Sequence, residues 1–345
     1  MRVVRALVPP RPAGPAGPGA LLAFAASALP NALGLAREVD VVHAHFTLPA
    51  GLIAWVLRSA RGRPFLVTLP GSDVPGYSAR PFSRLYSMST PLVRAIWRRA
   101  ARVVAVSDDL RQAAFRLEPT ARFDVIPSGV DTRRFAPPAG VRREPGRILL
   151  VGRLIGLKGQ AVFLRSLARV RKRWGGPLSV EIVGGGPDQE QLRGLASELG
   201  VSDVVHIHGF VPDEELTAHY ARASLFVLPS VNDAAPLAIL EAMASGLPVV
   251  ASAVGGIPEV LAGNEKVLFP AGDESALAEA IVRMISDPSL SDSIGMRNRE
   301  RALAFDWDRI ARRYLDLYRE VAAQAKSGAA VESGSGSQPP RAGQV

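Results

Sequence analysis

The sequence predicts an α/β fold made of two Rossmann-like domains. Three observations lead to this prediction: short β-rich runs alternate with helical segments, the alternation stops once and resumes, and the 345 residues exceed the usual size of one domain. An apolar fraction of 48% supplies enough buried side chains for two cores. Strands that alternate with helices form parallel sheets, so each domain is expected to bury its sheet between helical layers.

The first domain is expected at residues 1–140. It opens with a proline- and glycine-rich loop, followed by an apolar helix at 20–35 that Pro30 and Asn31 make unsuitable as a membrane anchor. Short β-branched runs are expected to form strands at 41–44, 65–68, 103–106 and 124–126. Helices are expected at 50–59 and, as one long arginine-rich segment, at 82–100.

A linker separates the two domains. Residues 136–147 contain three prolines, two glycines and four charged side chains, which is poor material for a core. The second domain is expected at 141–308, with strands at 148–151, 179–183, 204–207, 225–228, 249–251 and 266–269. Beyond it, 309–326 is expected to hold a helix, at 310–324, that could cross back to the first domain, and 327–345 to be a disordered tail.

Positive charge is concentrated in the first domain. Residues 1–140 contain 18 Arg, no Lys and 8 acidic residues, whereas the remainder is close to neutral. Such a field attracts anionic partners, and an anionic membrane surface fits it, with Arg94, Arg98 and Arg102 expected on one helical face. Nucleic acid is not expected as a partner, because the arginines are not interleaved with stacking aromatic side chains. The absence of cysteine excludes disulfides, thiolate metal sites and a cysteine nucleophile.

A glycine turn with two cations follows the first strand of the second domain. Gly152 and Arg153 come directly after the expected strand at 148–151, and Lys158 lies five residues further on. A glycine lets the backbone approach a ligand, and two cations here can converge on a diphosphate at the next helix N-terminus. On these residues alone, a loop with two solvated cations explains the segment equally well.

Another glycine-rich strand end and a histidine pair occur in the second domain. Gly184 and Gly185 follow the strand at 179–183, and His206 and His208 stand two residues apart on the next strand. Glycine-rich strand ends line the crevice in which doubly wound sheets bind nucleotides. The two histidines share one strand face with no third ligand apparent nearby, so they are interpreted as structural and no metal site is expected.

Two acidic residues flank the start of a helix in the second domain. Asp233 lies in the loop after the strand at 225–228, and Glu241 lies in the apolar helical segment that follows. Both are expected on the crevice side of the sheet, where carboxylates bind sugar and ribose hydroxyls through charge-assisted hydrogen bonds. The alternative, a solvated helix face, is disfavoured by the apolar surroundings.

In this order and spacing, residues 151–252 and 255–259 resemble the C-terminal domain of family 4 glycosyltransferases, which have the GT-B fold. Further matches to the family lie at 40–45, 106–107, 126–131 and 305–307. The resemblance implies two Rossmann-like domains that face a cleft. It also implies a retaining, metal-independent transfer of a hexosyl group from a UDP- or GDP-sugar, with no other cofactor.

The same resemblance implies a place in the cell. The acceptor would be a cell-envelope glycan or a lipid-linked molecule, as in polysaccharide biosynthesis. The protein would then be cytoplasmic and peripheral at the inner face of the cell membrane, where its basic first domain meets anionic lipid.

The resemblance also implies roles for individual residues. Arg153 and Lys158 would hold the diphosphate and stabilise it as a leaving group, and Asp233 would bind the transferred sugar. Glu241 would bind the ribose hydroxyls. The other donor-site residues, with Phe210 and Val211 against the base, would be Gly152, Gly184, Gly185, Phe210, Val211, Ala234, Ala235, Pro236 and Leu237. The acceptor side of the cleft would be lined by His45, Gly71, Ser72 and Asp73.

The chain departs from the family pattern in three places. Asp233 stands where the family usually has glutamate, which shortens the reach to the sugar. Pro70 stands where the family usually has histidine, and proline has neither a side-chain donor nor a backbone N–H. The segment before Asp40 is shorter than usual, so the first domain is expected to be truncated, lacking part of its sheet at the N-terminus.

These departures leave a second interpretation open. The chain would then be a catalytically weak or inactive GT-B protein that binds nucleotide sugar or membrane as a partner subunit. A third interpretation, a GT-B epimerase or phosphorylase, is disfavoured because Arg153, Lys158 and Glu241 have the transferase spacing.

Overall fold

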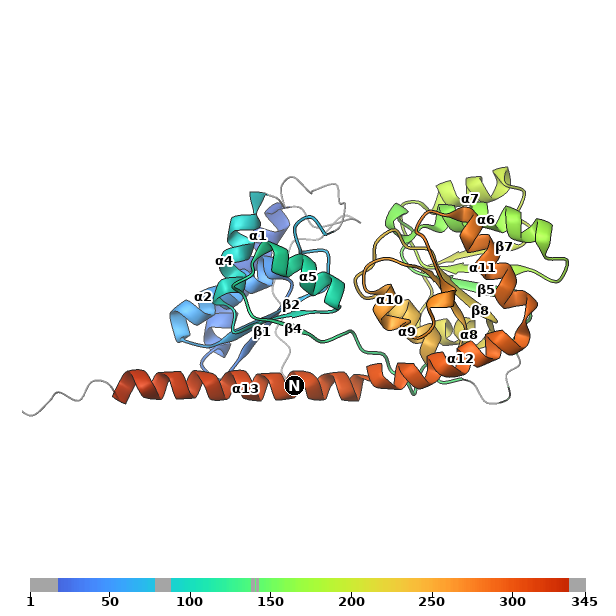
Figure 1. Cartoon of the computed structure of the whole chain (residues 1–345). Coiled ribbons are helices and arrows are strands. Elements are labelled where there is room, and N and C mark those ends of the chain that lie inside the picture. The colour runs from blue at the N-terminus through green and yellow to red at the C-terminus, as the bar shows by residue number, and fades with distance from the viewer. Residues whose placement is uncertain (1–17, 78–87, 138–139, 141–142, 335–345) are drawn as a thin grey trace, which may run out of the picture. The chain divides into compact units, whose positions relative to one another are not determined.

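The chain folds into two compact units, each built around one parallel β-sheet (Figure 1). The computed structural model describes residues 18–77, 88–137, 140 and 143–334. Unit 1 comprises the described parts of Met1–Ala105, Arg111–Val125 and Arg312–Val345, and unit 2 those of Val106–Leu110 and Ile126–Ala311. The expected fold class, two parallel-sheet α/β domains, is confirmed.

The described residues of unit 1 form a four-stranded parallel sheet in the order β1-β2-β3-β4. Its strands are β1 Val42–His45, β2 Phe65–Leu69, β3 Arg102–Ala105 and β4 Phe123–Val125. The helices along this part of the chain are α1 Pro18–Leu35, α2 Leu52–Arg61, α4 Thr90–Arg99 and α5 Asp108–Leu117. β2 is paired along both edges, and every one of its residues is buried. The expected incomplete N-terminus concerns residues 1–17, which lie outside the described part of the chain.

The arginine-rich helix expected at 82–100 is not continuous. α4 begins at Thr90, because Pro91 has no N–H to donate and fits only the first turn of a helix. Residues 78–87 lie outside the described part of the chain. Arg102 belongs to β3 rather than to a helix, so the expected stripe of Arg94, Arg98 and Arg102 was wrong in its last member.

Unit 2 contains a six-stranded parallel sheet in the order β10-β9-β8-β5-β6-β7. Its strands are β5 Arg147–Val151, β6 Ser179–Val183, β7 Val205–Gly209, β8 Leu225–Leu228, β9 Val249–Ser252 and β10 Leu268–Phe269. The bounds of β6 and β8 are those expected from the sequence. β10 is shorter than expected, because Glu265–Val267 form a 3-10 turn.

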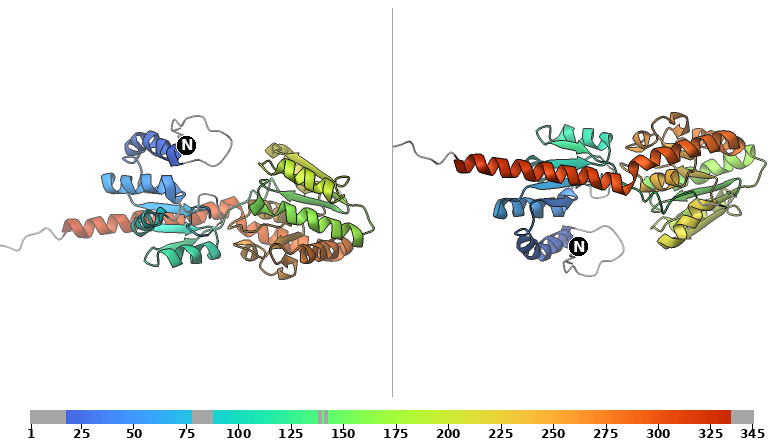
Figure 2. Two further views of the ribbon diagram at one scale, coloured as in Figure 1. Left: turned by 90° about the horizontal axis from the view of Figure 1, so that it is seen from above. Right: turned by 90° about the horizontal axis from the view of Figure 1, so that it is seen from below.

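Helices cover both faces of the unit 2 sheet (Figure 2). These helices are α6 Gln160–Arg173, α7 Gln189–Glu198, α8 Asp213–Arg222, α9 Leu237–Ala244, α10 Ile257–Val260, α11 Glu274–Ser286 and α12 Pro288–Ala302. With both faces covered, the strands become runs of buried apolar residues, and all four residues of β8 and of β9 are buried.

The last helix, α13 Trp307–Gly334, is longer than the helix expected at 310–324. Alanine and glutamate at 329–332 favour helix, so the regular structure continues past the expected start of the tail. From Arg312 onward the described part of α13 belongs to unit 1. Across the described segments, no helix combines the length and apolar character needed to cross a membrane.

Candidate functional site

The strand order of the unit 2 sheet reverses between β5 and β8. The chain passes from β5 to β6 on one side, whereas β8 on the other side comes later in the sequence. The loops that leave the carboxyl ends of β5 and β8 therefore diverge, and doubly wound sheets bind ligands in the crevice between such loops. The loop after β5 carries Arg153 and Lys158, and the loop after β8 carries Asp233.

Lys158 and Asp233 meet at this reversal as an ion pair. The Nζ of Lys158 donates to Oδ2 of Asp233, which also accepts from the hydroxyl of Ser230 at 3.3 Å. Both side chains are partly buried, whereas Arg153 is exposed. The two loops on either side of the reversal are thus joined by an ion pair, in which an anionic ligand can replace Asp233 as the partner of Lys158.

Glycines let the ends of β5 and β6 pack closely beside this ion pair. Gly184 has a φ of 136°, and a Cβ there would stand 2.0 Å from the carbonyl oxygen of Gly152. Main-chain hydrogen bonds join the two loops, from Gly152 N to the Val183 oxygen at 2.9 Å and from Leu154 N to the Gly185 oxygen at 3.0 Å. The two strand ends therefore form a continuous backbone wall.

Glu241 lies on α9 and is held by a buried tyrosine. Its Oε2 accepts from the hydroxyl of Tyr220 on α8 at 2.7 Å, and Tyr220 packs between Phe135 and Phe226. Burial raises the pKa of Glu241, while the Tyr220 hydroxyl and the Arg134 guanidinium oppose the shift by favouring the carboxylate. The carboxylate is therefore a fixed and partly desolvated hydrogen-bond acceptor.

Glu241 opens onto a pocket of about 330 Å³ within unit 2. Arg134 and Asp213 also line it, with 3.4 Å between Arg134 Nη1 and Asp213 Oδ2, and Trp307 forms part of its wall. This volume lies at the lower end of the range for ligand pockets. Arg134 and Asp213 were not expected from the sequence; their only signal was that Arg134 lies close to the family-like segment at 126–131 and that Asp213 lies within the one at 151–252.

Two of the family-like segments meet at this pocket although they lie far apart in the sequence. Val130 N donates to the Phe305 oxygen at 2.9 Å, and Trp307 N donates back to the Val130 oxygen at 3.1 Å. The indole of Trp307 packs against Gly129, where a Cβ would stand 2.5 Å from the ring. Only glycine fits at position 129, which explains why the segment 126–131 has a glycine there.

The remaining expected donor contacts lie on two loops of unit 2. Phe210, after β7, is 83% exposed, and the neighbouring Val211 is half-buried. The turn at 234–237 leads into α9, with Pro236 at the N-cap position and Ala234 buried. An exposed aromatic ring and a helix N-terminus are both available to a ligand here.

Two histidines lie on β1 in unit 1, and they differ in environment. His43 is enclosed, with Nδ1 2.6 Å from the Tyr318 hydroxyl and Nε2 2.7 Å from the Thr68 hydroxyl. Burial, with a smaller contribution from His45, lowers the pKa of His43 to about 4. His45, the residue expected on the acceptor side, is exposed, and its ring centroid lies 4.4 Å from that of His43. His45 is therefore the member of the pair that a ligand can reach.

Asp73, also expected on the acceptor side, is fully buried. Its Oδ2 accepts from the N–H of Thr47 at 2.7 Å and from the Thr47 hydroxyl at 3.0 Å, and Trp97 Nε1 donates to that hydroxyl at 2.9 Å. Burial raises the pKa of Asp73, and the bonds from Thr47 oppose the shift. Asp73 therefore fixes the loop after β1, while Ser72 beside it is half-buried and Gly71 is buried.

Two family models match the chain, one on each half. The model described as Glycosyltransferase Family 4 matches residues 2–134, and the model described as Glycosyl transferases group 1 matches residues 131–301. Together they cover both sheets and the segments that form the Lys158–Asp233 pair.

Relatives with similar sequences carry glycosyltransferase names. The GDP-mannose-dependent alpha-(1-6)-phosphatidylinositol monomannoside mannosyltransferase of Mycolicibacterium smegmatis is 33% identical over 285 residues, which cover 77% of this chain and 72% of that protein. The D-inositol 3-phosphate glycosyltransferase of Salinispora arenicola is 31% identical over 343 residues, covering 89% of this chain and 74% of that protein.

Solved structures confirm the fold. Sucrose-phosphate synthase from Thermosynechococcus elongatus superposes with a TM-score of 0.78 at 27% identity, covering 89% of this chain and 79% of that one. Anabaena HepE in complex with UDP gives a TM-score of 0.73 at 22% identity, covering 85% and 82%. Both units thus match GT-B glycosyltransferases, and by its sequence and its fold the chain is a glycosyltransferase that belongs to family 4.

Proposed function

We propose that this glycosyltransferase moves a hexosyl group from a nucleoside diphosphate hexose to a lipid-linked or cell-envelope acceptor, with retention of the anomeric configuration. The observation that carries the proposal is the Lys158–Asp233 pair at the reversal of the unit 2 sheet, in the same unit as the half-buried carboxylate of Glu241. Such a donor needs a cation for its diphosphate and acidic groups for its sugar and ribose hydroxyls.

The donor would bind through an exchange of ion pairs. Arg153 and Lys158 would neutralise the diphosphate, so Asp233 would leave Lys158 and accept hydrogen bonds from the hexose. Glu241 would bind the ribose, and Phe210 would pack against the base. The mannosyltransferase relative is GDP-mannose-dependent by name, which favours a GDP-hexose donor for this chain.

The transfer would be a front-face substitution at the anomeric carbon. The bond from this carbon to the β-phosphate oxygen breaks, and the acceptor oxygen bonds to the same face. The acceptor's proton passes to a departing phosphate oxygen, so the step needs no separate protein base. Arg153 and Lys158 would stabilise the charge that develops on the diphosphate, which is the role a metal ion fills in other transferases.

The acceptor would be an anionic, inositol-containing or lipid-linked molecule at the inner face of the membrane. Two observations support this class: the inositol acceptors in the names of the relatives and the excess of arginine in residues 1–140. Arg94 and Arg98 share one carboxylate, that of Glu118, at 3.0 and 3.4 Å. The net charge of these two arginines and Glu118 together is therefore +1. Attraction to a membrane would have to involve more of unit 1 than these side chains.

The test uses the full chain with GDP-mannose and vesicles that contain phosphatidylinositol. Lys158→Ala is expected to lower the transfer rate by roughly 100-fold, because one stabilising group is lost from the leaving diphosphate. Lys172→Ala is the matched control, since Lys172 is exposed at the end of α6, and it is expected to leave the rate unchanged. NMR of the product should show the α-anomer, and a chelator should leave the rate within about twofold.

Three results would overturn the proposal: an inverted product, a chelator-dependent rate, or full activity in Lys158→Ala. Donor binding without any transfer would instead support the inactive partner protein, which Pro70 favours because it offers no side-chain donor.

A further inference from the structure

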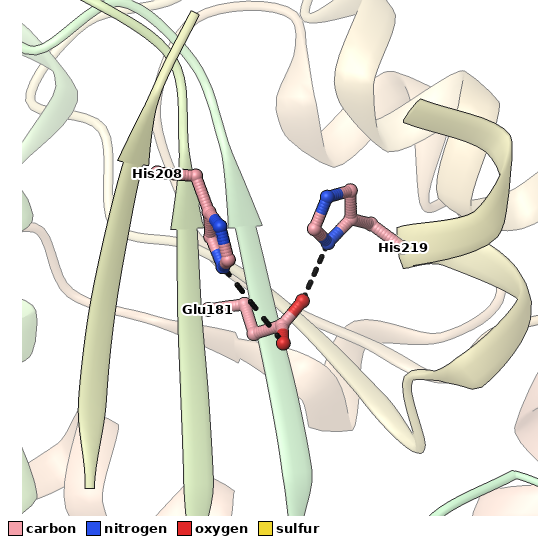
Figure 3. A group of neighbouring side chains, drawn as sticks. All are labelled: Glu181, His208 and His219. Carbon is pink, nitrogen blue, oxygen red and sulfur yellow. Dashed lines mark hydrogen bonds and ion pairs between the residues drawn. The ribbon is translucent and has the colours of Figure 1, made fainter. Parts of the chain in front are cut away.

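A group of one carboxylate and two imidazoles, none of them among the proposed donor contacts, lies between the unit 2 sheet and α8 (Figure 3). Glu181 stands in the middle of β6, His208 on the adjacent β7, and His219 on α8. The expectation that His208 has no further ligands nearby was therefore wrong. His206 is not part of this group, although it shares the strand with His208. The preceding strand and the following helix supply these partners, which the pattern along the strand alone did not reveal.

The distances in this group are close to those of a metal site. His219 Nδ1 lies 2.5 Å from Glu181 Oε2, His208 Nε2 lies 3.8 Å from Glu181 Oε1, and one ligand atom from each residue fits within 4.8 Å of the others. A tetrahedral zinc ion with bonds of about 2.0–2.2 Å holds its ligand atoms roughly 3.3 Å apart. Side-chain shifts on the order of 1 Å would therefore close the three ligands around an ion.

The exposure of the three side chains provides an entry path. Glu181 is 7% exposed and His219 16%, whereas His208 is 33% exposed at the edge strand of the described sheet. A water molecule can occupy the fourth position on the open side.

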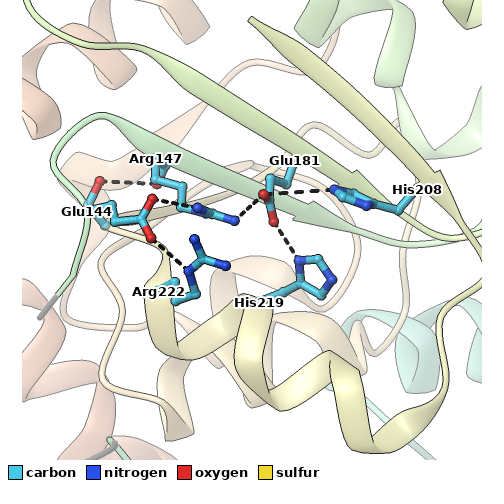
Figure 4. A network of polar contacts seen from close by, with 7 residues as sticks. Glu144, Arg147, Glu181, His208, His219 and Arg222 are labelled. Carbon is cyan, nitrogen blue, oxygen red and sulfur yellow. Dashed lines mark hydrogen bonds and ion pairs between the residues drawn. The ribbon is translucent and has the colours of Figure 1, made fainter. Parts of the chain in front are cut away.

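The surrounding charges hold the carboxylate in place (Figure 4). Arg147 Nη2 donates to Oε1 of Glu181, which directs Oε2 toward His219. Arg147 is itself paired with Glu144 at 2.5 Å, and Glu144 also accepts from Arg222 at 2.7 Å. Two carboxylates thus balance two guanidinium groups, and Arg147 acts as an outer partner of the kind that orients metal ligands.

We propose that Glu181, His208 and His219 bind one divalent ion of the zinc type, with water as the fourth ligand. Two imidazole nitrogens and one carboxylate oxygen are a donor set that suits Zn²⁺ and Co²⁺. The ion ties the edge strand β7 to α8 and stabilises unit 2. Because the positive charge of Arg147 remains nearby, the ion binds more weakly than in closed sites with four protein ligands. The ion is separate from the transfer step, so metal binding by the chain and sugar transfer by chelator-treated protein that remains folded are measured independently.

The experiment titrates the chelator-treated full chain with Co²⁺ and follows visible absorption, then repeats the titration with Zn²⁺ as competitor. One equivalent is expected to bind, and His208→Ala and His219→Ala are each expected to weaken binding at least about tenfold. His206→Ala is the matched control: an exposed histidine on the same strand is lost, and binding should stay within about twofold. Zn²⁺ should raise the Tm of the parent protein and of His206→Ala, but not of the other two variants.

Circular dichroism of each variant in chelator shows whether it is folded. If His219→Ala fails to fold, His208→Ala still decides, because its side chain is the most exposed of the three. Two results would overturn the proposal: no Co²⁺ spectrum in the folded parent protein, or a spectrum and a Zn²⁺-induced Tm shift that both persist in His208→Ala. Either result would leave the group as a hydrogen-bonded network around Glu181.

Discussion

Replacing Glu241 by glutamine should weaken nucleotide binding and, at the same time, stabilise the ligand-free protein. Glu241 is half-buried on α9 and receives a hydrogen bond from Tyr220. Burial raises its pKa from the usual 4.5, which means that the folded state disfavours the charge that ribose binding requires. Glutamine keeps the shape and one acceptor oxygen but removes the charge.

The loss of affinity follows from the hydrogen bonds. A bond to a charged group contributes about 1.5–3 kcal/mol and a neutral one about 0.5–1.5 kcal/mol, so two ribose hydroxyls lose roughly 2 kcal/mol in the variant. This corresponds to an increase of about 30-fold in Kd.

The gain in stability depends on pH with a definite sign. The charged carboxylate is more desolvated in the folded state than in the unfolded one, so the wild-type free energy of unfolding is reduced at pH values at which the unfolded chain carries this charge. This reduction is complete above the raised folded pKa and disappears below the unfolded value of 4.5, where Glu241 is neutral in both states. Glu241→Gln should therefore be more stable than the wild type at pH 7, and the difference should vanish toward pH 4.5.

Calorimetry with GDP and urea unfolding at pH 7 and pH 4.5 measure the two effects. Tyr220→Phe is the matched control, because it keeps the acid and removes its donor. This variant should also bind GDP more weakly, but it should lose roughly 1–3 kcal/mol of stability rather than gain it. An unchanged GDP affinity in Glu241→Gln would refute the ribose contact, and a loss of stability at pH 7 would refute the argument from burial.

Three further predictions concern the fold and the acceptor side. Gly184→Ala should lower the free energy of unfolding in urea by about 3 kcal/mol or more, because its Cβ would stand 2.0 Å from the Gly152 oxygen. Gly194→Ala is the control: this glycine lies in open space on α7, so the substitution should be neutral or slightly stabilising. Pro70→His should change turnover with GDP-mannose by less than about tenfold, since the leaving phosphate accepts the proton; a gain of 100-fold would show that a protein group is needed there. Burial lowers the pKa of His43 from 6.5 to about 4 in the folded protein. Between pH 6.5 and pH 4 the wild type should therefore lose about 3 kcal/mol of stability relative to His43→Asn. Equal unfolding curves for the two proteins across that range would contradict the burial of the His43 ring.

Strands were easier to predict from this sequence than helix ends. β6 and β8 have the expected bounds, because a strand buried on both faces reads as a short apolar run with clear borders. The start of α4 was missed because arginines and apolar residues continue the helical pattern on both sides of Pro91. Periodicity reports which face is buried but not where the backbone changes direction.

The candidate site was predictable in its residue types and not in its contacts. Glycine after a strand and acids before a helix are local signals, so the segments around Gly152 and Asp233 could be identified from the sequence. The role of Tyr220 could not, because its hydroxyl meets Glu241 only when α8 packs beside α9, and in the sequence it reads as a core aromatic residue. The side chains that group with His208 could not be predicted for the same reason, since Glu181 and His219 lie on other elements.

The ion pair between Lys158 and Asp233 also bears on how the proposed donor is selected. Without ligand, Lys158 and Asp233 already neutralise each other. A bound diphosphate therefore replaces Asp233 as the anion beside Lys158, and the binding free energy gains only the difference between the two interactions. Asp233 is then partly buried without its cation, a state that costs free energy unless new hydrogen bonds form. A free nucleoside diphosphate offers none at this position, whereas the hexose of an intact donor carries hydroxyls that can reach it. The sugar thus completes the site, and affinity for the intact donor should exceed affinity for the free nucleotide because of Asp233.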